Sequence, residues 1–316
     1  MFLNALKSTL AYLLYVVTVT LLLPLMPLRL WWKGRNAPAY RQRMGERFSL
    51  RSPAVRAGGV WVHAVSVGEV VAITPTINDL LDVHTERDIL VTTTTPTGSQ
   101  RLLSSFSYRD DDKPRDASDT GKRRGIKHQY MPYDWPILIW LFLRATRPAL
   151  FVVVETELWP ITLLLCRWLS IPVLVANARL SAKSANGYKR VGWLTRAMLK
   201  QVWIAAQGES DRMNFIDIGV SANKVRVIGN IKYDAEIDNA LKARAAQLRS
   251  ALQRAGKNFV WVAGSTHRGE DEVILEAHRW LVEHSPNAML ILVPRHPERF
   301  DAVSYTHLTL PTSPKV

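Results

Sequence analysis

Residues 60–81 read VWVHAVSVGEVVAITPTINDLL, and this stretch decides the fold. It begins with a short β-rich run, Val60–Val65, and a helical stretch from Glu69 to Leu81 follows after a turn that contains Gly68. Further apolar runs recur along the chain, several of them continuous, as in strands that are buried on both faces of a sheet. They cover residues 89–94, 151–154, 173–176, 202–206 and 225–228. Strands that alternate with helices predict an α/β fold with a doubly wound parallel sheet.

A second α/β unit is expected after residue 234. A polar helix over 235–255 connects the two units, and a strand (259–263), a helix (270–283) and a second strand (288–293) follow it. This βαβ pattern begins a second Rossmann-like domain, which usually needs on the order of 100 to 150 residues. We therefore expect residues 235–303 to be a partial domain. Residues 304–316 form an atypical tail that neither continues a helix nor makes a closing strand.

The balance of charge indicates an anionic partner. The net charge is +14, from 41 Lys and Arg against 27 Asp and Glu. Such an excess suits nucleic acid, an acidic membrane surface or a phosphorylated substrate. Many basic residues follow the most apolar segment, and we call this cluster the basic collar: Arg29, Lys33, Arg35, Arg41, Arg43, Arg47, Arg51 and Arg56. Its position favours contact with lipid headgroups, and the lack of interleaved aromatic residues makes nucleic acid the least favoured partner.

The apolar segment over residues 10–28 carries no charge and has roughly the 20 residues needed to cross a bilayer core. A cleaved signal peptide is the alternative, but bulky and basic residues stand where a small-residue cleavage site is required. Trp31 and Trp32 suit a membrane interface, and the basic collar is expected on the cytoplasmic side. We predict a membrane anchor over residues 1–28, with the body of the protein at the cytoplasmic face. The prolines Pro24 and Pro27 leave open whether the helix spans the membrane or is partly embedded.

Two further features limit the kinds of site. Residues 109–128 are rich in charge and predict a solvated insertion in the first domain, residues 29–234. The single cysteine, Cys166, excludes a disulfide framework and a cysteine-based zinc site, and its apolar sequence neighbours predict a buried side chain. No His/Asp cluster has metal-binding spacing, so we expect no metal site.

Polar residues follow several predicted strands, at the edge where open α/β sheets bind ligands. Glu69 lies at the first turn of a helix, where its carboxylate suits a general base for an attacking hydroxyl. It also complements the helix dipole, and from this segment alone the second interpretation is favoured. Glu155 and Glu157 follow the strand 151–154 and are expected near Glu69. A glycosidase-like acid/base pair is one interpretation of these two carboxylates.

A phosphate-suited group is expected in the second unit. Ser265, Thr266 and His267 join a strand to a helix and offer hydroxyl and N–H groups at a helix N-terminus. Arg295 and His296 follow the next strand, where a guanidinium suits an anionic oxygen.

Taken in order, many motifs resemble those of the 3-deoxy-D-manno-octulosonic acid (Kdo) transferases of lipopolysaccharide synthesis. The likeness covers about residues 1–303 and is carried by segments 61–70, 92–99, 130–134, 155–160, 177–181, 229–234, 263–267 and 294–299.

The resemblance implies a GT-B-like fold of two Rossmann-like domains, with an acceptor domain over 29–234 and a donor domain over 235–303. It implies transfer of Kdo from CMP-Kdo to a lipid A precursor at the inner membrane, without a metal or other cofactor. Glu69 becomes the favoured base, with Glu155 and Glu157 beside it. The donor-binding residues would be Ser265, Thr266, His267, Arg295 and His296. The acceptor-binding and phosphate-binding residues would be Arg29, Lys33, Arg35, Ser66, Gly68 and Lys232.

Three departures from the family pattern stand out. Ile161 replaces the usual Asn, the insertion over 109–128 is longer than usual, and the likeness stops near Val303. We expect a C-terminally truncated donor domain and poor turnover by the 316-residue chain. The alternatives are another GT-B transferase that uses a nucleotide sugar and a lipid acceptor, or a non-catalytic, membrane-anchored lipid-binding protein.

Overall fold

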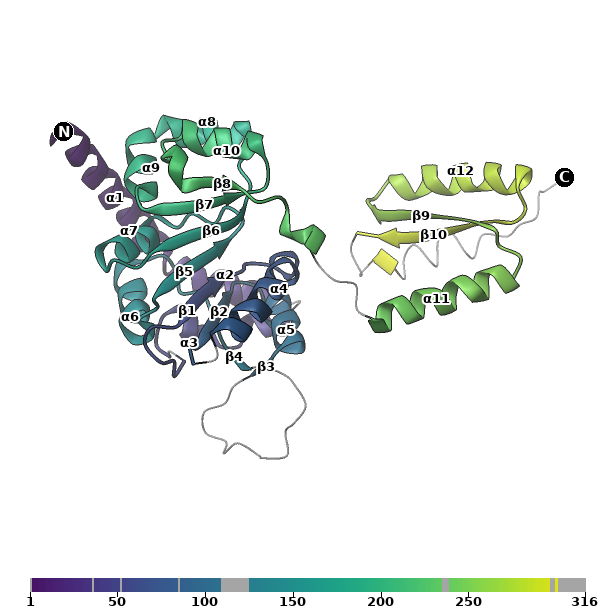
Figure 1. Cartoon of the computed structure of the whole chain (residues 1–316), viewed down its shortest axis with the longest axis horizontal. Coiled ribbons are helices and arrows are strands. Elements are labelled where there is room, and N and C mark those ends of the chain that lie inside the picture. The colour runs from purple at the N-terminus through teal and green to yellow at the C-terminus, as the bar shows by residue number, and fades with distance from the viewer. Residues whose placement is uncertain are drawn as a thin grey trace, which may run out of the picture. The chain divides into compact units, whose positions relative to one another are not determined.

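The computed structural model describes residues 2–35, 37–51, 53–84, 86–108, 125–234, 239–295 and 299–300. The chain divides into two compact units, residues 1–235 and 236–316, shown in Figure 1. Each unit is an α/β assembly built on a parallel sheet.

The N-terminal unit is built on an eight-stranded sheet in the order β3-β4-β2-β1-β5-β6-β7-β8. All neighbouring strands run parallel. The strands are β1 (Val60–His63), β2 (Ile89–Thr93), β3 (Ser107–Tyr108), β4 (Gly125–Tyr130), β5 (Leu150–Val154), β6 (Val173–Ala178), β7 (Val202–Ala206) and β8 (Val225–Val227). The strand order reverses between β1 and β5, and open α/β sheets bind ligands at such a switch point.

Helices cover both faces of this sheet (Figure 1). The helices of this unit are α1 (Phe2–Leu22), α2 (Leu25–Lys33), α3 (Met44–Arg47), α4 (Val67–Val83), α5 (Pro96–Ser105), α6 (Pro136–Thr146), α7 (Pro160–Trp168), α8 (Ala182–Arg190), α9 (Gly192–Leu199) and α10 (Glu209–Asp217). One core cluster joins α4 and α5 to the sheet through Val62, Ile77 and Leu102. The other joins α6 and α7 to it, and there Trp61 stacks on Phe151 with ring centroids 3.7 Å apart. Cys166 lies in this second cluster as a buried, free thiol, as predicted.

Strand β4 corrects one expectation from the sequence. The solvated insertion predicted over 109–128 is wrong for its last residues, because Gly125–His128 form the first part of β4. Lys127, His128 and Gln129 are buried between neighbouring elements, with exposed fractions of 4%, 2% and 1%. The sequence did not predict β4, because several of its side chains are polar. Residues 109–124 lie outside the described part of the chain.

Helix α1 packs along the rest of the N-terminal unit. Tyr12, Tyr15 and Val16 contact the core cluster between the sheet and α7. The opposite side of the helix is exposed and apolar, with Leu10, Leu13, Leu14, Val17 and Leu21. Within the described residues, no helix alone is long and apolar enough to cross a bilayer. The pair Thr9–Leu22 and Leu25–Lys33, bent by 50°, meets that requirement only when both are taken together.

The C-terminal unit contains a parallel pair of strands, β9 (Phe259–Thr266) and β10 (Ala288–Pro294). Helix α11 (Asn239–Arg254) precedes β9, and α12 (Glu270–His284) joins the two strands. The strand register pairs Pro294 with Thr266, so the polar residues that follow both strands lie at one edge.

Candidate active site

The loops after β1 and β2 are joined at the switch-point edge of the N-terminal sheet. The hydroxyls of Thr94 and Thr95 both donate to the carbonyl oxygen of Val65, at 3.2 and 3.1 Å. Thr95 also caps α5, since its Oγ1 accepts from the Gly98 N–H at 3.1 Å. A Cβ atom at Gly98 would lie 2.9 Å from Thr95 Oγ1 and 3.4 Å from the carbonyl oxygen of Val65. The glycine thus lets α5 approach this loop closely.

Glu69 lies in the first turn of α4, directly after this loop. Its Oε2 accepts from the Val65 N–H at 2.7 Å, and its Oε1 accepts from the Ser66 hydroxyl at 2.9 Å. The side chain is buried, and burial raises the pKa of its carboxyl. The two hydrogen bonds oppose this shift, whereas the negative charges of Glu155 and Glu157 add to it. A raised pKa brings a carboxyl closer to the range in which it exchanges protons near neutral pH.

The two acids after β5 differ in their surroundings. Glu155 adopts a left-handed backbone conformation (φ 62°), and its Oε1 accepts from Lys232 Nζ at 2.8 Å. Glu157 is half-buried, and burial together with the charge of Glu155 raises its pKa. Lys232, predicted to bind phosphate, thus pairs with the Glu155 carboxylate in this structure, and its role in binding phosphate stays a prediction.

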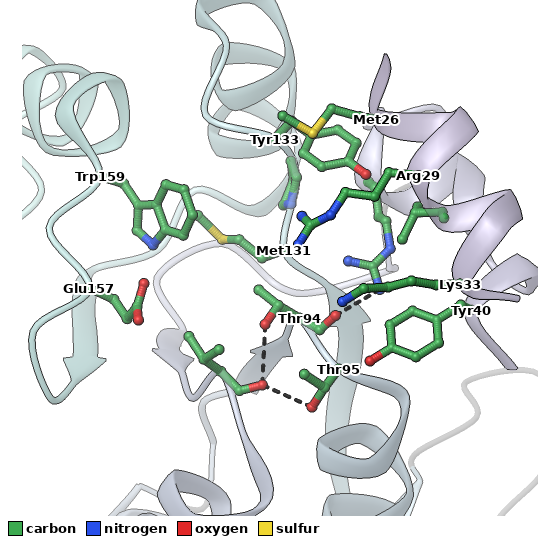
Figure 2. Close-up of a pocket in the computed structure, with 14 residues that line it drawn as sticks. Met26, Arg29, Lys33, Tyr40, Thr94, Thr95, Met131, Tyr133, Glu157 and Trp159 are labelled. Carbon is green, nitrogen blue, oxygen red and sulfur yellow. Dashed lines mark hydrogen bonds between the residues drawn. The ribbon is translucent and has the colours of Figure 1, made fainter. Parts of the chain in front are cut away.

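A cavity of about 380 Å³, which we call the basic pocket, lies at the same edge (Figure 2). It is lined by Met26, Arg29, Leu30, Lys33, Tyr40, Arg47, Val65, Thr94, Thr95, Met131, Pro132, Tyr133, Glu157 and Trp159. Figure 2 shows Arg29 and Lys33 on helix α2 at one side of the cavity and Glu157 and Trp159 at the other. The pocket therefore places cationic side chains opposite one carboxylate.

Only some of the predicted acceptor-binding residues line the basic pocket. Arg29 and Lys33 line the basic pocket, whereas Arg35 is exposed and does not line it. Ser66 and Gly68 lie in the loop and first turn that hold Glu69, just beyond the pocket wall at Val65. The structure thus places the predicted base directly beside the cavity.

Arg47 is a pocket residue that sequence reasoning assigned only to the collar. Its side chain is 4% exposed, its Nη2 donates to the Thr94 carbonyl oxygen at 2.8 Å, and its guanidinium lies over the Tyr130 ring. Its Nε has no hydrogen-bond partner among the described residues. Two other collar residues form ion pairs: Arg43 with Glu46, three residues away, and Arg56 with Asp88, 32 residues away. The residues that Arg47 contacts, Thr94 and Tyr130, lie far from it in the sequence, so no local sequence pattern predicts that its charge is buried.

The predicted donor residues of the C-terminal unit come together at its own sheet edge. The Arg295 N–H donates to the Thr266 carbonyl oxygen at 3.0 Å. The Thr266 hydroxyl donates to Asp271 Oδ1 at 2.6 Å, and the His267 N–H donates to Glu270 Oε2 at 2.7 Å. Ser265 adopts a left-handed conformation (φ 60°) and is exposed. His296 lies outside the described residues. The donor-binding role of these residues stays a prediction.

These features define an α/β protein of the GT-B type, as predicted from the sequence. UDP-GlcNAc 2-epimerase from Neisseria meningitidis is similar with a TM-score of 0.50 and 16% identity, over 80% of this chain and 70% of that chain. At that identity the likeness shows the fold alone. The chain belongs to the Kdo transferase family, because the model of the 3-deoxy-D-manno-octulosonic-acid transferase family matches residues 42–235.

Two bacterial relatives extend this match. The 3-deoxy-D-manno-octulosonic acid transferase of Haemophilus influenzae is 37% identical over 295 residues, which are 90% of this chain and 64% of that protein. The protein of the same name from Bordetella pertussis is 31% identical over 304 residues, 91% of this chain and 64% of that protein. The chain thus spans about two-thirds or less of the length of the relatives that it matches.

In the described part of the chain, no three His, Cys, Asp or Glu side chains are grouped closely enough to hold a metal ion.

Proposed function

We propose that the protein transfers Kdo from CMP-Kdo to a phosphorylated lipid A precursor, and that the N-terminal unit binds this acceptor. The observation that carries the proposal is the basic pocket, where Arg29, Lys33 and Arg47 face a cavity beside Glu69. Arginine and lysine side chains bind phosphate oxygens through charge-assisted hydrogen bonds. Membership of the Kdo transferase family supports the choice of donor and acceptor.

The chemistry requires one proton acceptor. The acceptor hydroxyl attacks the anomeric carbon of Kdo, a new C–O bond forms, and the bond to the phosphate breaks with its electron pair leaving on CMP. Glu69 takes the hydroxyl proton, for which its raised pKa and its position beside the pocket suit it. Donor groups at the edge of the C-terminal unit, among them His267 and Arg295, stabilise the negative charge on the departing CMP. No metal or other cofactor enters this mechanism.

We also propose that α1 and α2 attach the protein to the cytoplasmic face of the inner membrane. Exposed apolar side chains continue from α1 into α2, at Leu25, Leu28, Trp31 and Trp32. Arg29 and Lys33 of α2 also line the basic pocket, so the same helix serves the pocket and the lipid surface. A lipid acceptor held at its sugar would thereby keep its acyl chains near the bilayer. Flotation of the protein with vesicles that contain anionic lipid tests this, and substitution of Trp31 and Trp32 by Ser should reduce it.

The test of the transfer reaction is acceptor-dependent CMP release. The assay compares the 316-residue chain with a chimera that continues into the remaining part of the Haemophilus influenzae relative, each with and without Glu69→Gln. We expect the chimera to release CMP, and its Glu69→Gln variant to bind the acceptor but to release CMP about 100-fold more slowly or less. A chimera that releases no CMP from CMP-Kdo but works with another nucleotide sugar would instead support a different transferase. Acceptor binding without any transfer would support a lipid-binding protein.

A further inference from the structure

Asp134 is a buried carboxylate at the junction of two walls of the basic pocket. Residues 131–133, directly before it, line one wall. Its oxygens accept from the start of α7, directly after the wall formed by Glu157 and Trp159. Oδ2 accepts from the Ile161 N–H at 2.9 Å, and Oδ1 accepts from the Thr162 N–H at 2.8 Å and its hydroxyl at 2.6 Å.

These bonds hold the end of the second wall in place. The first N–H groups of a helix have no partner inside the helix, and a carboxylate satisfies them and complements the helix dipole. Trp159, the N-cap residue of α7, makes no side-chain capping bond, so Asp134 performs this task from another segment. Because the acid is 4% exposed, water competes little for these bonds.

Helix α1 reaches the same carboxylate. The Tyr15 hydroxyl donates to Asp134 Oδ2 at 2.9 Å, across 119 residues of sequence. One residue further on, Trp135 Nε1 donates to Thr20 Oγ1 at 2.8 Å. Two side-chain hydrogen bonds thus join α1 to the segment between the two pocket walls. Hydrogen bonds to a charged acceptor are stronger than those between neutral groups. We therefore expect the Tyr15–Asp134 bond to contribute more to holding α1 in place than the Trp135–Thr20 bond does.

We propose that Tyr15 and Asp134 are positioning residues, through which the docking of α1 sets the shape of the basic pocket. Asp134 holds the Glu157–Trp159 wall at the start of α7, and Tyr15 keeps Asp134 in the orientation that does so. A pocket formed in this way is complete only when α1 lies against the rest of the N-terminal unit. The consequence for acceptor binding rests on the proposed function.

The test uses Tyr15→Phe, which removes one hydroxyl, and Tyr12→Phe as the matched control. Tyr12 lies one turn earlier on α1, and its buried hydroxyl has no hydrogen-bond partner among the described residues. Two readouts are measured on the full chain labelled with 5-fluorotryptophan. The first is the ¹⁹F resonance of Trp159, assigned by its absence in Trp159→Phe. The second is the dissociation constant for a bisphosphorylated glycolipid in detergent micelles.

We expect Tyr15→Phe to shift or broaden the Trp159 resonance and to weaken glycolipid binding by about fivefold, whereas Tyr12→Phe changes neither. A folded Asp134→Asn variant should change the Trp159 resonance and the glycolipid dissociation constant more strongly than Tyr15→Phe does. If Asp134→Asn does not fold, the result for Tyr15→Phe alone tests the proposal. An unchanged Trp159 resonance in Tyr15→Phe, or equal effects of the two tyrosine variants, would overturn the proposal. If the wild type binds no glycolipid, the proposed function fails, and the Trp159 resonance alone decides the positioning role.

Discussion

The guanidinium of Arg47 lies 4.1 Å from the centroid of the Tyr130 ring. Tyr130 ends strand β4 and is buried, so the ring forms a fixed surface under the charge. Such cation–π contacts are worth about 2 kcal/mol when they are desolvated. In the described part of the chain, Arg47 forms no ion pair, and burial lowers its pKa, although a guanidinium stays charged at neutral pH. A buried cation that faces a cavity is well placed to bind an anionic group of a ligand.

This arrangement predicts different effects for two arginines of the basic collar. Arg47→Met should weaken binding of a phosphorylated glycolipid by about tenfold, equivalent to about 1.4 kcal/mol, because it removes a desolvated donor. Arg35→Met removes an exposed charge that does not line the pocket and should change the dissociation constant less than twofold at 0.15 M salt. Isothermal calorimetry in micelles measures both. Equal losses would show that general charge attraction, not the pocket, binds the lipid.

Glu69 predicts a pH dependence of transfer. The base must be ionised, and burial raises its pKa, so the rate should increase with pH as this carboxyl loses its proton. Glu69→Gln should lower the transfer rate by about 100-fold or more and remove this limb of the pH profile. The dissociation constant for the acceptor should stay within about twofold of wild type, since Gln keeps the acceptor oxygen that bonds the loop at Val65. A Glu69→Gln variant with an intact rate would exclude Glu69 as the base.

Two buried histidines predict a loss of stability in acid. Burial lowers the pKa of His63 to about 4, and burial together with Arg43 and Arg47 lowers that of His128 to about 3, from 6.5. Below pH 6.5 the unfolded chain binds protons that the folded state does not, so the free energy of unfolding falls as pH decreases toward 4. Each histidine contributes about 1.4 kcal/mol per pH unit in this window.

His128→Gln tests the histidine contribution, because Gln can accept from Arg43 and donate to Thr93 as the imidazole does. Urea unfolding of the N-terminal unit between pH 7 and pH 4 should show a shallower pH slope for the variant, by about 1.4 kcal/mol per pH unit. Identical slopes for variant and wild type would contradict the assignment.

The C-terminal unit contains a buried anchor for its predicted donor loop. Asp271 is 2% exposed, accepts from the Thr266 hydroxyl and pairs with Arg299. Asp271→Asn should destabilise this unit by about 3 kcal/mol, because it leaves Arg299 without its charge partner. Thr266→Ser retains the hydroxyl and serves as the control, with an expected loss below about 1 kcal/mol. Hydrogen exchange at the amides of β9 and β10 reports the local stability, and equal protection in both variants would contradict this role.

Sequence patterns predicted those parts of the fold in which local residues decide the structure. Continuous apolar runs such as Phe151–Val154 are buried strands, and β1 leads into a helix as expected. The helix begins earlier than predicted, at Val67, so Gly68 lies in the first turn of α4 and not in the loop before it. Strand β4 was missed because Lys127, His128 and Gln129 look solvated until their neighbours are known. Hydrophobic pattern cannot detect a buried polar strand whose partners, such as Arg43 for His128, lie 85 residues away.

The site shows the same limit. Arg29 and Lys33 were predicted from their place beside an apolar helix, and Glu69 was predicted as the base only from the family resemblance. Arg47 and Asp134 were not singled out, because their importance comes from burial and from contacts over 47 and 119 residues of sequence. Lys232 has a further partner that the sequence did not indicate, since it pairs with Glu155, 77 residues away. Local spacing identifies candidates, and only tertiary contacts decide which of them remain available to a ligand.

The most direct test of the central claim is CMP release from CMP-Kdo, measured with and without a bisphosphorylated lipid A precursor. The chimera that continues into the Haemophilus influenzae relative is compared with its Glu69→Gln and Arg47→Met variants. We expect acceptor-dependent release by the chimera, release that is about 100-fold slower or less in Glu69→Gln, and a raised acceptor KM for Arg47→Met. Release that persists undiminished in Glu69→Gln, or that does not depend on the acceptor, would contradict a transferase whose base lies beside the basic pocket.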